Sequence, residues 1–384
     1  MKSVLERRVV LTFVLGAAVA IACGDLKSAD TSFPDGGAAA SSGDGSSTKG
    51  GETPSEETRD GGGRADGSGV GPAAACRKIV LDCLDPAAAN VIEVPTESTL
   101  PDALNGAKAG DTIQIRGKTL GAGWQVSPYT TLRGCDGAKI SGSISFAGTG
   151  GTIEGFDVSG TIVANKTGSY VVRYNRFTTG AANEAGVSGR SVDSLVSASV
   201  TLVVDSNSFE SRDLGVEART NYDTGTHQVD ITVRNNVFAH VPKPFIASKA
   251  GLVGVINAKI EHNTFYDFDT AVRLTGVDAI TSGNLFVKGT KGIEGSAYDV
   301  AYSFTWQVTT AAATPARSGA FAEGDPAFVD ANAGDFRLGP SSAVVDRIPD
   351  SVQVPGEDYL GCPRPAGPPG ARAQSDVGAF ESQP

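Results

Sequence analysis

The fold of this chain is decided by the stretch Val233-Arg234-Asn235-Asn236-Val237-Phe238, because its pattern recurs along the sequence. Each copy reads as an apolar residue, an outward residue, any residue, asparagine, any residue and phenylalanine. Further copies lie at residues 172–177, 204–209 and 260–265, and an incomplete copy lies at residues 283–286. The asparagines recur roughly every 20–30 residues, which is typical of solenoids in which each repeat forms one coil.

The two fixed residue types explain how such coils would stack. Asparagine tolerates the left-handed conformation of a tight turn, and its side-chain amide both donates and accepts hydrogen bonds. The phenylalanine two positions later can point inward and pack on the phenylalanine of the next coil, about 4.8 Å away. We therefore expect an asparagine ladder beside a phenylalanine stack.

With this repeat, residues 90–345 resemble the right-handed parallel β-helix proteins of the pectin-lyase-like superfamily. The segments 324–330, 334–338 and 376–381 are similar to the tail that follows many bacterial surface β-helices, although Ser342-Ala343-Val344 stands where that tail usually has Ser-Pro-Ala. The resemblance implies an all-β fold, a right-handed single-stranded parallel β-helix. It implies nothing about the substrate.

A short capping helix is expected at the N-terminal end of this solenoid. Apolar residues recur at helical spacing over residues 100–107, Thr99 can cap the helix, and Gly110 ends it. Residues 111–116 then alternate apolar and polar like a strand. Such a helix would cover the open end of the sheet, which would otherwise pair with other chains.

The first segment of the chain predicts export and a lipid anchor. Arg7 and Arg8 precede an uncharged run over residues 9–22, which is shorter than the roughly 20 apolar residues of a membrane span. The run ends in Ala20-Ile21-Ala22-Cys23, which resembles a bacterial lipobox, where the cysteine carries diacylglycerol. Gly24 replaces the aspartate of the usual inner-membrane retention signal, so the resemblance implies anchoring at the outer membrane or cell surface.

These observations divide the chain into four predicted segments. Residues 1–23 are a lipoprotein signal peptide, and residues 24–75 are a Gly/Ser/Asp-rich tether with too little apolar surface to offset the entropy of ordering. Residues 76–345 are the β-helix domain, and residues 346–384 are a C-terminal tail that packs on it. The net charge of −11 argues against nucleic acid as a partner, because phosphate binding needs a basic face.

Four cysteines follow Cys23, and an exported chain favours disulfides between them. They are Cys76, Cys83, Cys135 and Cys362. The segment between Cys76 and Cys83 resembles a strand, which would hold the two sulfurs too far apart to bond. Each of these two is therefore expected to pair with Cys135 or Cys362.

One column of charges predicts an ion-pair ladder. The residues two positions before each asparagine alternate in sign from coil to coil: Arg173, Asp205, Arg234 and Glu261. Opposite charges on neighbouring strands contribute about 0.2–1 kcal/mol per pair. We interpret this column as structural.

A second column points to a ligand. Three bases follow the expected strand starts at Val187, Val216 and Ile246 by three residues each, namely Arg190, Arg219 and Lys249. Like charges on adjacent strands are unfavourable unless something neutralises them. The row therefore predicts an anionic partner such as an acidic polysaccharide. The alternative is a solvated face with carboxylates such as Glu217 nearby.

The same prediction places other residues around this row. Those expected to border the ligand are Glu217, Tyr222, Asp223 and His227. If the chain catalyses elimination, Arg219 or Lys249 is the expected base, because a neighbouring cation lowers the pKa of each. Lysine is more easily shifted than arginine, so Lys249 is the better candidate.

Three functions remain open on the sequence. The chain lacks the adjacent aspartates and Gly-His-Gly of the pectin hydrolases and has no recognisable lyase motif, which favours non-catalytic binding of polysaccharide or another surface ligand. The first alternative is a lyase that acts on a uronate glycan by β-elimination, with calcium as cofactor. The second is a structural or adhesive stalk. The three histidines lack metal-ligand spacing, and His262 is expected to be exposed at a turn, so no metal or other cofactor is predicted.

Overall fold

The computed structural model describes residues 81–191, 197–220, 226–251, 253–295, 297–364 and 374–382. The predicted signal peptide with Cys23, and the predicted tether, lie outside these residues. Within this part of the chain, no helix is long and apolar enough to cross a membrane.

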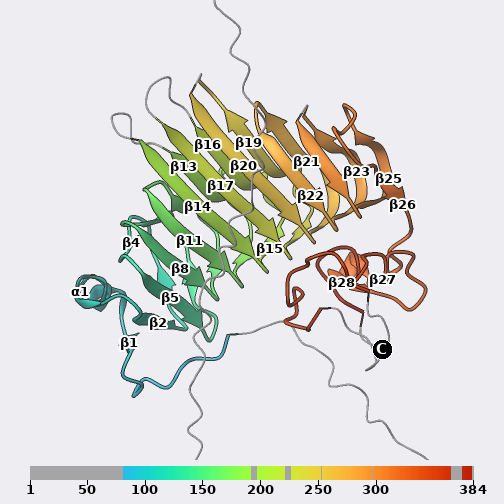
Figure 1. The fold of residues 1–384 in the computed structure, drawn as a ribbon. Coiled ribbons are helices and arrows are strands. Elements are labelled where there is room, and N and C mark those ends of the chain that lie inside the picture. The colour runs from blue at the N-terminus through green and yellow to red at the C-terminus, as the bar shows by residue number, and fades with distance from the viewer. Residues whose placement is uncertain are drawn as a thin grey trace, which may run out of the picture. The chain divides into compact units, whose positions relative to one another are not determined.

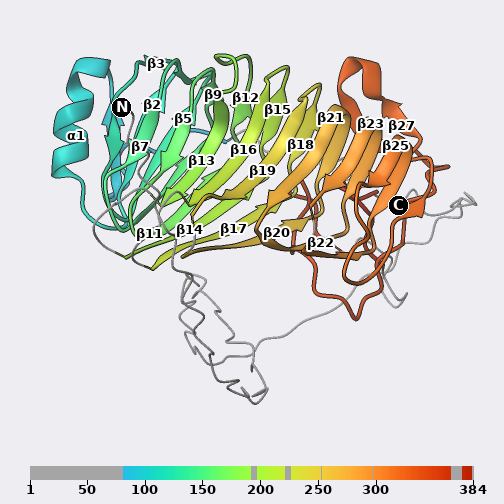
Figure 2. The same ribbon diagram turned by 90° about the horizontal axis from the view of Figure 1, so that it is seen from above.

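The described chain forms a right-handed parallel β-helix with three faces, as predicted (Figure 1 and Figure 2). The first face is a ten-stranded parallel sheet. Its strands are, in order, β1 (Val91–Val94), β2 (Thr112–Arg116), β5 (Thr130–Cys135), β8 (Gly150–Glu154), β11 (Gly168–Arg173), β14 (Ala198–Asp205), β17 (His227–Arg234), β20 (Gly254–Glu261), β22 (Asp278–Ser282) and β24 (Tyr298–Ala301).

The other two faces belong to one sixteen-stranded sheet. The second face holds β3 (Thr119–Leu120), β6 (Lys139–Ile140), β9 (Asp157–Val158), β12 (Arg176–Phe177), β15 (Ser208–Glu210) and β18 (Val237–Ala239). The third face holds β4 (Gln125–Val126), β7 (Ile144–Phe146), β10 (Ile162–Ala164), β13 (Ala185–Ser191), β16 (Leu214–Thr220) and β19 (Lys243–Lys249). The long strands β21 (Thr264–Thr275), β23 (Leu285–Glu294) and β25 (Phe304–Ala312) run through both faces and join them.

The asparagine ladder and the phenylalanine stack are both confirmed. Each ladder amide donates from Nδ2 to Oδ1 of the next asparagine at 3.0–3.1 Å, through Asn175, Asn207, Asn236, Asn263 and Asn284. Neighbouring rings lie 4.6–5.1 Å apart between centroids in the column Phe177, Phe209, Phe238, Phe265 and Phe286. The repeat therefore builds both the turn and the core.

The expected conformation of the ladder asparagines is wrong. The residue before each of them takes the left-handed conformation instead, with φ between 53° and 63° at Tyr174, Ser206, Asn235, His262 and Gly283. The ladder amide also donates to the backbone, as from Asn236 Nδ2 to the Arg234 carbonyl at 2.8 Å. The asparagine therefore closes the turn with its side chain, while its predecessor takes the strained backbone position.

The ion-pair ladder on the first face is confirmed only in part: the four predicted residues lie in one register, but of their successive pairs only Arg234–Asp205 lies within ion-pair distance. Arg234 pairs with Asp205 at 2.8 Å, while Arg173 lies opposite both Asp205 and Glu154 in the strand register. Arg173 pairs with Glu154 at 2.7 Å. Glu261 lies opposite Arg234 at the end of this column without an ion pair, and burial raises the pKa of its carboxyl group.

The N-terminal cap is confirmed, with one correction to its place in the chain. η1 (Glu97–Thr99) and α1 (Leu100–Gly106) lie at one end of the solenoid (Figure 2), where Leu100 joins the buried core. The helix follows strand β1, which pairs with β2, so residues 111–116 contain the second strand of the sheet and not the first. Thr99 donates its hydroxyl to the Thr96 carbonyl and makes no side-chain cap.

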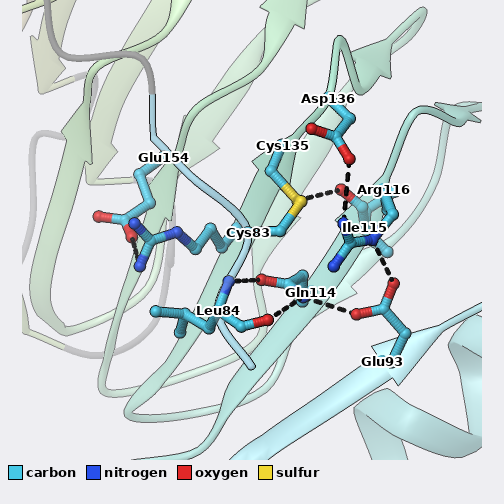
Figure 3. The surroundings of a disulfide bond; sticks show 10 residues. Cys83, Leu84, Glu93, Gln114, Ile115, Arg116, Cys135, Asp136 and Glu154 are labelled. Carbon is cyan, nitrogen blue, oxygen red and sulfur yellow. Dashed lines mark hydrogen bonds and ion pairs between the residues drawn. A yellow bond between two sulfur atoms is a disulfide. The ribbon is translucent and has the colours of Figure 1, made fainter. Parts of the chain in front are cut away.

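A disulfide fastens the N-terminal segment to the first face (Figure 3). Cys83 bonds to Cys135 at the end of β5, which confirms one predicted pairing. Gln114 strengthens this attachment by accepting from the Leu84 amide and donating to Glu93, both at 2.6 Å. Cys362 is also disulfide-bonded, while Cys76 lies outside the described residues.

The C-terminal tail begins earlier than the predicted boundary at residue 346. The coils end with β26 (Ala322–Glu323), after which β27 (Phe328–Asp330), η2 (Ala331–Ala333) and β28 (Asp335–Leu338) form an antiparallel hairpin. This tail packs on the outer side of the second face, where Phe336 and Val344 belong to the same buried apolar cluster as Val237. The outward residues of β18, β21 and β23 are apolar there, which provides the surface that the tail covers.

His262 shows the effect of this cover. It was expected to be exposed, but only 2% of it is accessible. Burial and the nearby Arg364 guanidinium lower the pKa of His262 well below its usual range. The turn that carries His262 is exposed in a bare coil and becomes buried once the tail packs on it.

Candidate functional site

The predicted basic row is only partly correct. Arg190 and Arg219 lie directly opposite each other on the adjacent strands β13 and β16. On the next coil, however, Ser248 lies opposite Arg219, and Lys249 lies opposite Thr220. Because side chains alternate along a strand, this shift of one residue removes Lys249 from the row.

The cause of this error is the start of β19. Val216 pairs with Phe245 and not with Ile246, the strand start expected from the sequence. Two consecutive apolar residues fit the inward position equally well in sequence, so the pattern left the register undecided. In the structure Phe245 is fully buried, while Ile246 is only partly buried.

Glu217 holds the two remaining bases. Its carboxylate contacts Arg190 Nη2 at 2.8 Å and Arg219 Nε at 2.6 Å, and it is 3% exposed. Ser188 supports the same carboxylate, since its hydroxyl donates to Glu217 Oε2 at 3.3 Å. We call these residues the Arg190–Glu217–Arg219 cluster, which carries a formal charge of about +1.

Both guanidinium groups keep part of their surface open to solvent. The Arg190 and Arg219 side chains are 43% and 46% exposed, although the carboxylate between them is buried. A buried carboxylate fixes the direction of each guanidinium, and a guanidinium can bind a further carboxylate through two parallel hydrogen bonds. The cluster can therefore receive an anion with little reorganisation.

The other predicted border residues divide into two groups. His227 is 1% exposed, with its Nδ1 2.7 Å from the Ser191 hydroxyl, so it lies inside the protein and not at a ligand surface. Tyr222 and Asp223 lie outside the described residues.

The arrangement of the candidate bases does not favour elimination. Arg219 is engaged by Glu217, and Lys249 lies one register position away from the row. Among the described residues, the group of possible metal ligands close enough to share an ion is Cys83, Cys135 and Asp136. The two sulfurs of that group form the disulfide, so it offers no metal site.

Sequence reasoning missed a second polar column, at the bend between the second and third faces. The residues two positions after four of the five stacked phenylalanines take left-handed conformations, with φ between 50° and 59°: Ser211, His240, Asp267 and Lys288. His240 Nδ1 lies 2.7 Å from Asp267 Oδ2, and a cleft of about 460 Å³ adjoins this pair. On these coils, the residue two positions after the phenylalanine is polar in the sequence. This recurrence was the signal that could have revealed the column.

Comparison with known proteins adds one structural likeness. No protein-family model matches the chain, and no curated protein matches it. Among solved structures, the chain is similar to a doubly substituted pectate lyase from Xanthomonas campestris, at 12% identity and a TM-score of 0.29. The similarity covers 60% of this chain and 82% of the lyase. The pairing of the strands itself establishes the β-helix fold.

Proposed function

We propose that this chain is an exported, lipid-anchored cell-surface protein whose β-helix binds an acidic polysaccharide without cleaving it. The observation that supports binding is the Arg190–Glu217–Arg219 cluster. Its two guanidinium groups lie on adjacent coils in matched register, and one buried carboxylate orients both. The export and anchoring rest on the lipobox-like segment that ends at Cys23.

The spacing of the coils suits a polymer of uronates. Adjacent parallel strands lie about 4.8 Å apart. A polyuronate repeats about every 5 Å, so successive carboxylates would meet Arg190 and then Arg219. The interaction is between partly exposed charges, and retention should therefore weaken as salt rises.

The proposal that the chain binds without cleaving rests on the contacts and positions of the two candidate bases, Arg219 and Lys249. A base for elimination must reach the proton that it removes, in the correct protonation state. Arg219 donates to Glu217 and is engaged by that carboxylate, while Lys249 is displaced from the row. We therefore expect retention of an acidic glycan with no increase in absorbance from unsaturated uronate.

Replacing both arginines should weaken retention strongly. We expect the double substitution Arg190→Gln and Arg219→Gln to weaken retention of polygalacturonate or alginate by about tenfold or more, because each lost charge-assisted hydrogen bond contributes about 1.5–3 kcal/mol. Affinity electrophoresis of the purified full chain in gels containing each polysaccharide measures this change. Lys249→Gln is the matched control and should have a small effect. An equal loss of retention in both variants would mean that Lys249 belongs to the binding row with the two arginines. Retention unchanged by the double substitution would contradict the proposal.

The lipid anchor has a separate test. We expect Cys23→Ala to block incorporation of labelled palmitate when the chain is expressed in a bacterium, because the lipid is attached to that sulfur. The unsubstituted chain should incorporate the label and fractionate with membranes. Equal labelling of the two chains would contradict the anchor and leave the binding proposal intact.

A further inference from the structure

A cavity of about 630 Å³ lies between the second face of the solenoid and the C-terminal tail. Strands β12, β15 and β18 contribute one side of it, and residues 332–337 and 359–360 of the tail contribute the other. Figure 1 shows the tail hairpin β27–β28 beside the solenoid. Ligand-binding cavities commonly enclose about 300–1,000 Å³, so this one has room for a small molecule.

Ser208 gives this cavity an unsatisfied hydrogen-bonding group. The residue lines the cavity, is 4% exposed, and has no partner for its hydroxyl within the described part of the chain. A buried hydroxyl without a partner is destabilising, so its presence calls for a group that enters the cavity. The outward neighbours of Ser208 on the adjacent coils are Arg176 and Val237, neither of which fills that role.

Two ion pairs line the same cavity. Arg176 Nη2 contacts Glu210 Oε2 at 2.8 Å, and Arg337 Nη2 contacts Asp335 Oδ2 at 2.6 Å. The Arg176 and Arg337 side chains remain 48% and 53% exposed, so their outer edges are open to a ligand. The charges within each pair cancel, so these pairs add no net charge to the cavity. The Arg190–Glu217–Arg219 cluster, in contrast, has a net positive charge.

The side chains of these two ion pairs can form hydrogen bonds with neighbouring hydroxyl groups of a sugar. Guanidinium groups donate two parallel hydrogen bonds, carboxylates accept two, and a sugar hydroxyl both donates and accepts. Phe336 and Tyr359 line the cavity as well and supply apolar surface for the carbon faces of a sugar ring. A charge-balanced, planar and partly aromatic lining favours a neutral polyhydroxylated ligand over a polyanion.

We propose that this cavity binds a neutral saccharide through Ser208 and the Arg176–Glu210 and Arg337–Asp335 pairs. This site is separate from the Arg190–Glu217–Arg219 cluster and does not depend on it. Because the tail forms one wall, the saccharide would bind to the solenoid and the tail together and hold them in place.

Isothermal titration calorimetry of the full chain with maltotriose, cellotriose and xylotriose tests the proposal. We expect at least one of these neutral probes to bind and Ser208→Ala to weaken that binding about tenfold, in line with a lost hydrogen bond in a buried site. The same substitution should leave the melting temperature unchanged or higher, because it removes a hydroxyl that has no partner among the described residues.

Ser303→Ala is the matched control. Ser303 is also fully buried, but its hydroxyl donates to the Ala301 carbonyl and accepts from the Asn284 amide. We expect this variant to melt at a lower temperature and to keep its affinity for the neutral probe. The double substitution Arg190→Gln and Arg219→Gln should also keep that affinity, so failure of the acidic site and failure of this site are distinguishable.

Three results would overturn the proposal. The first is no heat of binding from any of the three neutral probes at millimolar concentration, which would leave the cavity to solvent. The second is binding that Ser208→Ala does not weaken. The third is preferential, Ser208-dependent binding of trigalacturonate, which would make the site one for anions.

Discussion

Phe238→Ala should lower the free energy of unfolding by about 3–5 kcal/mol. The ring is fully buried and stacks between Phe209 and Phe265, at 4.6 Å and 5.1 Å between centroids. Its removal leaves a cavity in the middle of a continuous column, and each coil of a solenoid contacts only its neighbours, so no other element can fill the space. Urea denaturation followed by circular dichroism measures the change.

Two control substitutions test whether the loss of stability comes from the lost volume of the buried ring. Phe238→Leu keeps most of the apolar volume and should cost less than the alanine substitution. Val255→Ala removes an apolar side chain that is 47% exposed on the first face and should change stability by no more than about 0.5 kcal/mol. A loss of less than 1 kcal/mol for Phe238→Ala would mean that the stack contributes little to the core.

Arg364→Met should release the C-terminal tail, at a cost of about 3–5 kcal/mol. The Arg364 side chain is fully buried and donates to Glu381 Oε2 at 3.0 Å and to the Gly378 carbonyl at 2.8 Å. The Glu381 side chain is only 1% exposed, so the substitution leaves its carboxylate buried without the guanidinium. Burial lowers the pKa of Arg364.

Limited proteolysis distinguishes loss of the tail from loss of the whole fold. In the Arg364→Met chain we expect cleavage within residues 350–382 at protease levels that leave the coils intact, because the tail adds to the solenoid from outside. Adding Glu381→Leu to the same chain should recover much of the stability, since an apolar pair replaces a broken ion pair. Equal resistance of the tail in the original and Arg364→Met chains would show that its apolar contacts suffice to hold it.

Local repetition made much of the fold predictable. The asparagine and phenylalanine columns follow from one short pattern, because every copy has the same neighbours one coil away. The alternating column that contains Arg234 was predictable for the same reason. Like positions on successive coils lie next to each other, so these columns could be predicted without knowledge of distant contacts.

Register and conformation within a coil were harder to predict. Lys249 was placed on the wrong row because Phe245 and Ile246 are both apolar and either fits the inward position. The left-handed residue of the turn was assigned to Asn236 although it is Asn235, since the sequence does not say whether an asparagine serves through its backbone or its side chain.

The sequence by itself determined that the chain is a parallel β-helix, which positions stack along its axis, and that Cys83 bonds to Cys135 or Cys362. The tertiary structure decided that Glu217 binds both Arg190 and Arg219, and that the tail covers His262 and closes a cavity over Ser208. The physical reason is the range of the interactions. Stacking depends on a periodic pattern that every coil repeats, whereas the packing of the tail depends on contacts that occur once and join residues distant in the sequence.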